Sequence, residues 1–147
     1  MKRSPRRKLP TTLLSLSLTL LISSATTVPA ALSASDQNAR QTALRWLTSV
    51  DVGNYGAAYE QQPPRIRAAK MKEQFVKWML VRRAPLGYAR ARNFLRVVHT
   101  HKLIGAPDGD YQKMLFKTSF EKKPLGLEMI VLTSETGHWQ VSGYAVR

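Results

Sequence analysis

The sequence predicts an α+β domain in which N-terminal helices pack on a four-stranded antiparallel β-meander, as a cone or roll. Three observations lead to this fold class. Before Tyr88 apolar residues recur at the spacing of a helix, and after it they alternate with polar residues as in a half-buried strand. The third observation is the turn at 105–110, where Pro107 presets φ, Asp108 suits the next position and Gly109 can adopt a positive φ.

Residues 1–34 have the three parts of a secretory signal peptide, which we expect to be cleaved between Ala30 and Ser35. A basic start precedes an apolar run at 13–22 and a segment of small residues. A membrane anchor needs about 20 apolar residues, and this run is about half as long. We therefore expect one mature α+β domain at 35–147, periplasmic or secreted, that meets a membrane only during export.

Three helices are expected in the N-terminal half of the mature chain. The first begins near Asp36, with Ser35 or Asp36 as its N-cap, and ends at Gly53. A shorter helix follows up to Pro63, and a third runs from about Met71 to Arg83, where cations suit the helix C-terminus. The apolar stripe of the first helix consists of Ala39, Ala43, Trp46, Leu47 and Val50.

Four strands are expected after these helices. On the first, an apolar face alternates with a basic face: the apolar set is Ala89, Ala91, Leu95 and Val97, and the basic set is Arg90, Arg92 and Arg96. On the second, Met114, Phe116 and Phe120 share one face, with Lys113 and Lys117 on the other. On the third, Glu128 alternates with an apolar set that consists of Leu125, Leu127, Met129 and Val131. Ile130 and Leu132 indicate that this strand is buried on both faces near its end. The fourth strand, 138–146, follows a turn at 135–137 and places Trp139 and Val141 on one face.

Four spaced motifs support a family resemblance. They are Ala-Leu-Arg-Trp-Leu-Thr-Ser-Val-Asp-Val-Gly-Asn-Tyr at 43–55, Arg-Ala-Pro-Leu-Gly at 83–87, Gly-Ala-Pro-Asp-Gly-Asp-Tyr at 105–111 and Trp-Gln-Val-Ser-Gly-Tyr at 139–144. Over about residues 39–147 the chain resembles the bacterial family called domain of unknown function 4019, although Tyr59 stands where a Trp is expected. The resemblance implies an exported bacterial protein without an established activity, so no catalytic residue is carried over. At the level of fold alone, the order of elements is similar to the α+β cone of nuclear transport factor 2 and ketosteroid isomerase.

Net charge and the absence of cysteine limit the classes of binding partner and of catalytic or metal site that this chain can have. The formal charge is +14, and removing the five cations of the basic start leaves +9 for the remainder. Such a charge attracts polyanions, among them anionic lipid and acidic glycans, whereas export makes nucleic acid an unlikely partner. Cysteine is absent, which excludes disulfides, thiolate catalysis and Cys-based metal centres.

Three histidines and two turn carboxylates are candidate metal ligands. His99 and His101 lie two apart on a strand and share a face, and His138 is a conceivable third nitrogen ligand. No carboxylate is placed beside the pair in sequence, so we expect surface histidines rather than a metal site. Asp108 and Asp110 are explained by turn chemistry, with too few oxygen ligands for calcium. We expect no metal and no cofactor.

Two sets of residues remain as candidate sites, and neither is catalytic by motif. Arg90, Arg92 and Arg96 form a basic stripe suited to phosphates or acidic glycans, or else a solvated edge that prevents strand pairing. Three residues are candidates for a pocket between helix and sheet, namely Asp51, Tyr55 and Tyr59, although the tyrosines can equally anchor the short helix.

The leading functional prediction is a small non-catalytic binding or interaction module of the bacterial envelope. Its partner is an unidentified protein or an anionic envelope component, with a homodimer through the sheet left open. One alternative is a small pocket enzyme of the isomerase or dehydratase type. Another is an accessory protein that contacts anionic envelope surfaces through the basic strand face. We expect a closed core between the first helix and the sheet, which favours the binding module.

Overall fold

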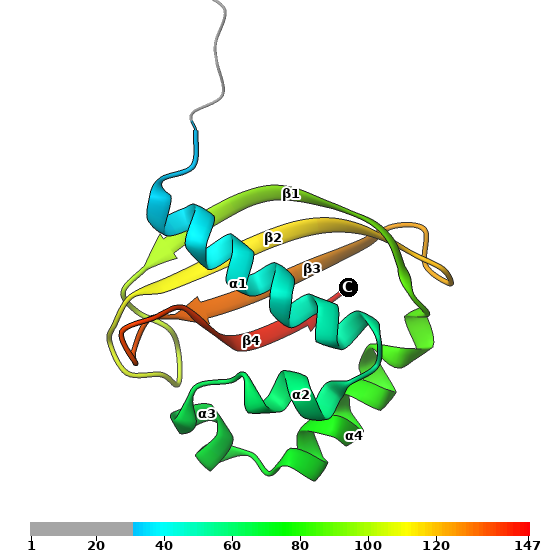
Figure 1. Cartoon of the computed structure of the whole chain (residues 1–147), viewed down its shortest axis with the longest axis horizontal. Helices are drawn as coiled ribbons and strands as arrows, with labels where there is room; N and C mark the ends of the chain where they lie inside the picture. Colours follow the sequence, from blue (N-terminus) through cyan, green and yellow to red (C-terminus); the bar gives the residue numbers. More distant parts are fainter. Residues whose placement is uncertain (1–30) are drawn as a thin grey trace, which may run out of the picture. The chain divides into compact units, whose positions relative to one another are not determined.

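The computed structural model describes residues 31–147 and confirms the α+β class (Figure 1). Its helices are α1 (Ala34–Asp51), α2 (Tyr55–Glu60), α3 (Pro64–Ala69) and α4 (Lys72–Arg82), followed by a short 3₁₀ helix at Ala84–Leu86. Its strands are β1 (Ala89–Thr100), β2 (Tyr111–Phe120), β3 (Gly126–Thr133) and β4 (Gln140–Val146). The signal-peptide prediction falls almost entirely on residues outside the described part, so it stays a prediction.

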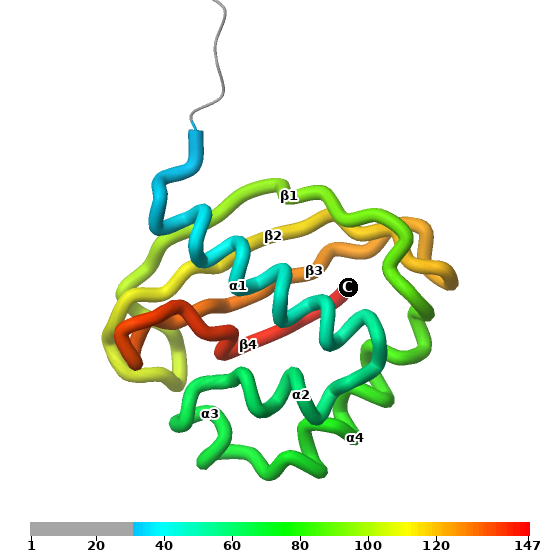
Figure 2. Tube along the Cα trace, viewed as in Figure 1, coloured from blue at the N-terminus to red at the C-terminus, as the bar shows by residue number. Residues whose placement is uncertain are grey.

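The sheet is an open antiparallel meander in the order β1-β2-β3-β4. Figures 1 and 2 show α1 lying across one face of this sheet, with α2, α3 and α4 beside β4. Trp78 of α4 packs edge-on against Tyr144 of β4, with ring centroids 6.3 Å apart. No helix within residues 31–147 has the length and hydropathy that crossing a membrane requires.

The helix α1 begins earlier than the sequence predicts. Its N-cap is Ser33, which has an extended backbone and whose hydroxyl accepts a hydrogen bond from the Asp36 N–H at 3.1 Å. The expected caps, Ser35 and Asp36, lie inside the first turn, because Ser33 already satisfies that orphan donor. At the other end Gly53 adopts the positive φ of 75° that was expected of a helix stop.

The space between α1 and the sheet is filled by side chains. Trp46 anchors this core: it is 1% exposed, and its indole Nε1–H donates to the carbonyl oxygen of Ala58 at 2.8 Å. Its ring also packs against Tyr144, with centroids 5.4 Å apart. The predicted helix stripe is fully buried here together with the inward residues of the strands: Ala39, Ala43, Leu47, Val50, Met114, Phe116, Ile130, Leu132 and Val141.

The prediction of which β1 side chains face the core is wrong for the first half of the strand. Arg92 and Phe94 face the core, and Leu95 is 48% exposed. A bulge between Phe94 and Arg96 then shifts the alternation, so that Val97 packs on the core as predicted. The alternation rule failed because it assigned every arginine to solvent, whereas Arg92 finds ionic partners inside.

The prediction of which β3 side chains face the core is also wrong, again because a charged residue was assigned to solvent. Glu128 is 0% exposed and shares the inward face with Ile130 and Leu132, whereas Leu127 and Met129 are 43% and 39% exposed.

The turn between β1 and β2 also differs in one detail from the prediction. Gly105, at φ 77°, is the glycine that uses the left-handed region, while Gly109 has no positive φ.

Candidate binding surface and interior ion-pair network

A network of charged side chains spans the interior from the end of α1 to the sheet. Asp51, the last residue of α1, accepts two hydrogen bonds from the Arg92 guanidinium, at 2.8 and 3.0 Å. Its Oδ1 also accepts one from Arg83 at 2.9 Å. Arg83 is 2% exposed, stacks over the ring of Phe120 and donates to the carbonyl oxygen of Gly87 at 2.6 Å.

Glu128 closes the network on the sheet side. It accepts from Arg92 Nε at 2.7 Å, from the Thr118 hydroxyl at 2.5 Å and from the Tyr144 hydroxyl at 2.7 Å. A fully buried carboxylate is tolerated only when it is paired and hydrogen-bonded in this way. Glu128 is therefore paired with one cation, Arg92, and oriented by donors from three different strands.

Two members of the network, Arg92 and Tyr144, have raised pKa values. Burial alone lowers the pKa of Arg92, but the hydrogen bonds to Asp51 and Glu128 outweigh it, so the pKa is raised and the cation stays charged. For Tyr144, burial raises the pKa, and the neighbouring negative charge of Glu128 raises it further. Tyr144 is therefore a permanent hydrogen-bond donor rather than a proton carrier at neutral pH.

The three residues predicted to line a pocket take part in the interior instead. Asp51 is bonded to two arginines, as described above. Tyr55 is 6% exposed, and burial raises its pKa, opposed by Arg83 and assisted by Asp51. The Tyr59 hydroxyl lies 2.8 Å from the carbonyl oxygen of Lys70 and bonds α2 to the end of α3. These contacts match the anchoring alternative for the tyrosines.

The predicted basic stripe is divided between two sides of the sheet. Arg92 belongs to the interior network, whereas Arg90 and Arg96 are exposed. Arg90 lies over the ring of the exposed Tyr88, with 5.5 Å from its Cζ to the ring centroid. The three arginines therefore do not form one surface, although Arg96 joins a different set of cations on β2.

The face of the sheet opposite α1 carries these cations, and we call it the open face. Its rows follow from the register: Arg96 pairs with Leu115, and Leu115 with Met129; Val98 pairs with Lys113, and Lys113 with Val131; Asn93 pairs with Lys117, and Lys117 with Leu127. Leu115, at the centre, is flanked by the three cations, and four further apolar side chains lie at the ends of the rows: Val98, Leu127, Met129 and Val131. None of these nine positions is acidic.

A family model described as protein of unknown function (DUF4019) matches residues 42–144, which include both Asp51 and Glu128. The chain belongs to the DUF4019 family. No curated protein and no solved structure matched the chain. The matched region of this DUF4019 domain includes the residues of the ion-pair network and of the open face.

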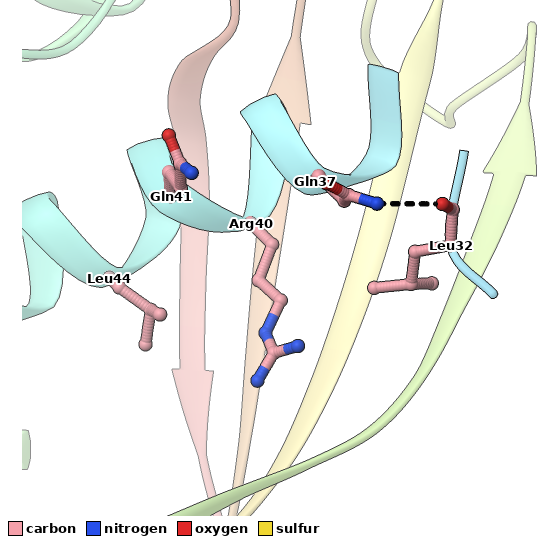
Figure 3. A pocket seen from close by; sticks show the side chains of 5 residues that line it. All are labelled: Leu32, Gln37, Arg40, Gln41 and Leu44. Carbon is pink, nitrogen blue, oxygen red and sulfur yellow. Dashed lines mark hydrogen bonds between the residues drawn. The ribbon is translucent and has the colours of Figure 1, made fainter. Parts of the chain in front are cut away.

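A cavity of about 430 Å³ lies beside α1 and is lined by Leu32, Gln37, Arg40, Gln41 and Leu44 (Figure 3). Arg40 extends from α1 and lies over the Phe94 ring, 4.9 Å from Cζ to the ring centroid. The dashed line in Figure 3 is the bond from the Gln37 amide to the carbonyl oxygen of Leu32, at 3.0 Å. This cavity is separate from the network, whose carboxylates line none of the cavities described within residues 31–147.

Two of the three histidines considered as metal ligands each contact one carboxylate. His99 Nε2 lies 2.6 Å from Asp36 Oδ1, and His101 Nδ1 lies 2.9 Å from Asp110 Oδ1. His138 is on the turn before β4, 3.4 Å from the Thr136 hydroxyl. Within the described part of the chain no three His, Asp or Glu side chains are arranged to hold a metal ion.

Several important side chains could not be identified from the sequence. Arg83 looks like an ordinary cation at a helix end, and Glu128 looks like the polar member of an alternating strand. The one sequence signal was Glu128, an acidic residue within a strand that is otherwise mostly apolar, because such a residue needs a basic partner if the strand is buried. The contact of Asp36 with His99 joins residues 63 apart and has no local signature.

Proposed function

We propose that this chain is a non-catalytic binding module of the bacterial envelope, which uses the open face to bind an anionic envelope surface. The observation that carries the proposal is the composition of that face. Arg96, Lys113 and Lys117 flank exposed apolar side chains, and no carboxylate shares their rows. Cations around an apolar centre suit an anionic lipid surface, because each cation near such a surface contributes about 1 kcal/mol.

The interior favours a binding role over the pocket-enzyme alternative. A general base must be within hydrogen-bond reach of the substrate's proton. Asp51 and Glu128 are the carboxylates of the ion-pair network, and both already accept hydrogen bonds from arginine, threonine or tyrosine donors. A packed core and paired carboxylates support a structural interior, with binding left to the outside.

The same charges argue against a homodimer through the open face. Two copies docked face to face would bring Arg96, Lys113 and Lys117 of both chains together. Like charges at close range oppose association. An anionic surface is therefore the better complement for this face than a second copy.

The experiment is vesicle co-sedimentation of the domain at 31–147 with anionic phosphatidylglycerol vesicles and with zwitterionic phosphatidylcholine vesicles. We expect binding to the anionic vesicles alone, weakening as salt rises. In the triple variant Arg96→Gln, Lys113→Gln, Lys117→Gln, losing about 1 kcal/mol per cation should weaken binding roughly a hundredfold.

The matched control is the triple variant Arg45→Gln, Lys77→Gln, Arg82→Gln. It removes the same charge from exposed positions on the helices. We expect this control to keep most of the affinity. Equal losses in the two triple variants would show that net charge alone drives binding, and would contradict a role for the open face.

A further inference from the structure

A groove at one end of the sheet has the chemistry of a second binding site, separate from the open face. It has a volume of about 320 Å³, within the range of ligand pockets. The N-terminal end of α1 lies over the end of β1 and the start of β2 (Figure 1). Its lining includes Ser35, Asp36, His99, Asp110, Gln112 and Trp139.

Gln112 is the observation that points to a ligand. It is 1% exposed, it lines the groove, and its Oε1 has no hydrogen-bond partner among the described residues. Buried amides are nearly always hydrogen-bonded, so an unpartnered one needs an explanation. Rotating the amide exchanges its oxygen and nitrogen, so the group at this position can act as an acceptor or as a donor.

The charged groups of the groove are already paired with each other. Asp36 is bonded to His99, and Asp110 to His101. A charged ligand would have to compete with these pairs, whereas a neutral ligand leaves both intact. With Nε2 of His99 directed at Asp36, its Nδ1 is the nitrogen directed elsewhere.

The remaining groups offer hydrogen bonds around an aromatic side chain. The half-buried Trp139 donates from its indole Nε1 to the Ser35 hydroxyl at 3.3 Å, which leaves that hydroxyl its own proton to donate. Amide, imidazole and hydroxyl groups beside an indole suit a ligand with many hydroxyls and one apolar face. A sugar ring has both properties.

We propose that this groove binds a neutral saccharide, with Gln112 and Ser35 bonded to its hydroxyls and Trp139 against its ring. An extended peptide fits less well, because the groove lies across the ends of the strands. A peptide that extends a sheet needs the length of a free strand edge.

The test is a titration of the domain at 31–147 followed by NMR of the tryptophan indole N–H signals. The probes are the trimer of N-acetylglucosamine, maltotriose and inorganic phosphate. We expect a neutral trisaccharide to shift the Trp139 signal, while the Trp46 signal, buried and bonded to Ala58, stays in place. Co-sedimentation with insoluble cell-wall glycan, with and without competing trisaccharide, separates a polymeric source from a free sugar.

The decisive variant is Gln112→Met, which removes the amide and keeps the side-chain length. Because the amide oxygen has no partner, we expect an unchanged or higher Tm together with at least tenfold weaker saccharide binding. Gln140→Met is the control: Gln140 is bonded to Gln61 and Thr136 outside the groove, so affinity should not change. Ser35→Ala, at an exposed position, supplies a second test whatever the stability of the first variant.

Three results would overturn the proposal. They are no shift of Trp139 with either trisaccharide, saccharide binding to Gln112→Met and Ser35→Ala at wild-type strength, and binding of phosphate in place of the sugars. Failure here leaves the vesicle result untouched, since none of the open-face cations lines the groove.

Discussion

Arg92 shows how much one residue's role depends on its neighbours in space. On β1 its local pattern indicates a solvent-facing cation, yet it joins α1 to β3 by bonding Asp51 and Glu128 together. Neither acid is within 30 positions of Arg92 in the chain, since the separations are 41 and 36 residues. The alternation of polar and apolar residues can predict which face of a strand a side chain is on. It cannot predict that a carboxylate distant in sequence lies next to that face in the fold.

Removing Arg92 should therefore destabilise the fold strongly. Arg92→Met leaves two carboxylates without their main cation, and breaking a buried pair in this way costs about 3–5 kcal/mol. Urea denaturation followed by tryptophan fluorescence measures the change. Adding Glu128→Gln to Arg92→Met should recover part of the loss, because the uncompensated charge is removed. Strictly additive losses in the double variant would contradict the network.

The helix α1 is the element that organises the described domain. Its central stripe, predicted from spacing alone, is buried as expected, because amphipathic periodicity reports directly which side of a helix meets a core. Its N-terminal end was less predictable. Ser33 caps it two residues earlier than expected, and Asp36 contacts His99 on β1. The contact with His99 is a tertiary one, which helix propensity does not contain.

The contact of α1 with β1 should make stability depend on pH. Burial raises the pKa of Asp36, but the hydrogen bonds from His99 and Ser33 outweigh it, and the pKa falls below its ordinary value of 3.8. A carboxylate with a lowered pKa in the folded state stabilises that state above its unfolded pKa of about 3.9. This contribution to stability is lost as the pH falls through the pKa that Asp36 has in the folded state.

Thermal denaturation between pH 2 and 6 tests this expectation. The wild-type Tm should fall on acidification in the window below about pH 4, and Asp36→Asn should show a smaller fall there. Asp108→Asn is a suitable control, since Asp108 is an exposed turn residue. Identical pH profiles for wild type and Asp36→Asn would contradict a stabilising role of the Asp36–His99 contact.

As a whole, the domain described at residues 31–147 has a closed core and two candidate binding surfaces on its outside. The closed core follows from the volume and spacing of apolar side chains on α1 and β2, and it was predicted. The open face and the groove are assembled from several elements. Lys113 and Lys117 were placed correctly on the outer side of β2, but their alignment with Arg96 depends on the bulge in β1.

Export remains a prediction about the whole chain. We expect protein made in a bacterial host to lose its N-terminal segment by cleavage between Ala30 and Ser35. Cleavage directly after Ala30 would retain Ser33 as the N-cap of α1, whereas cleavage after Ser35 would remove it. N-terminal sequencing of the mature protein gives the answer, and a chain that keeps Met1 and stays in the membrane would contradict the prediction.

The amino-acid sequence by itself determined the α+β class, the number of strands, the buried stripe of α1 and the family to which the chain belongs. These properties depend on the periodicity of apolar residues within short segments and on sequence motifs, and both can be identified without the fold. Only the tertiary structure decided the facing of β1 and β3, the pairing of Arg92 with Asp51 and Glu128, and the unpartnered amide of Gln112. The physical reason is that a buried charge or amide is stable or unstable according to its partner, and its partner is set by which distant segments the fold brings together.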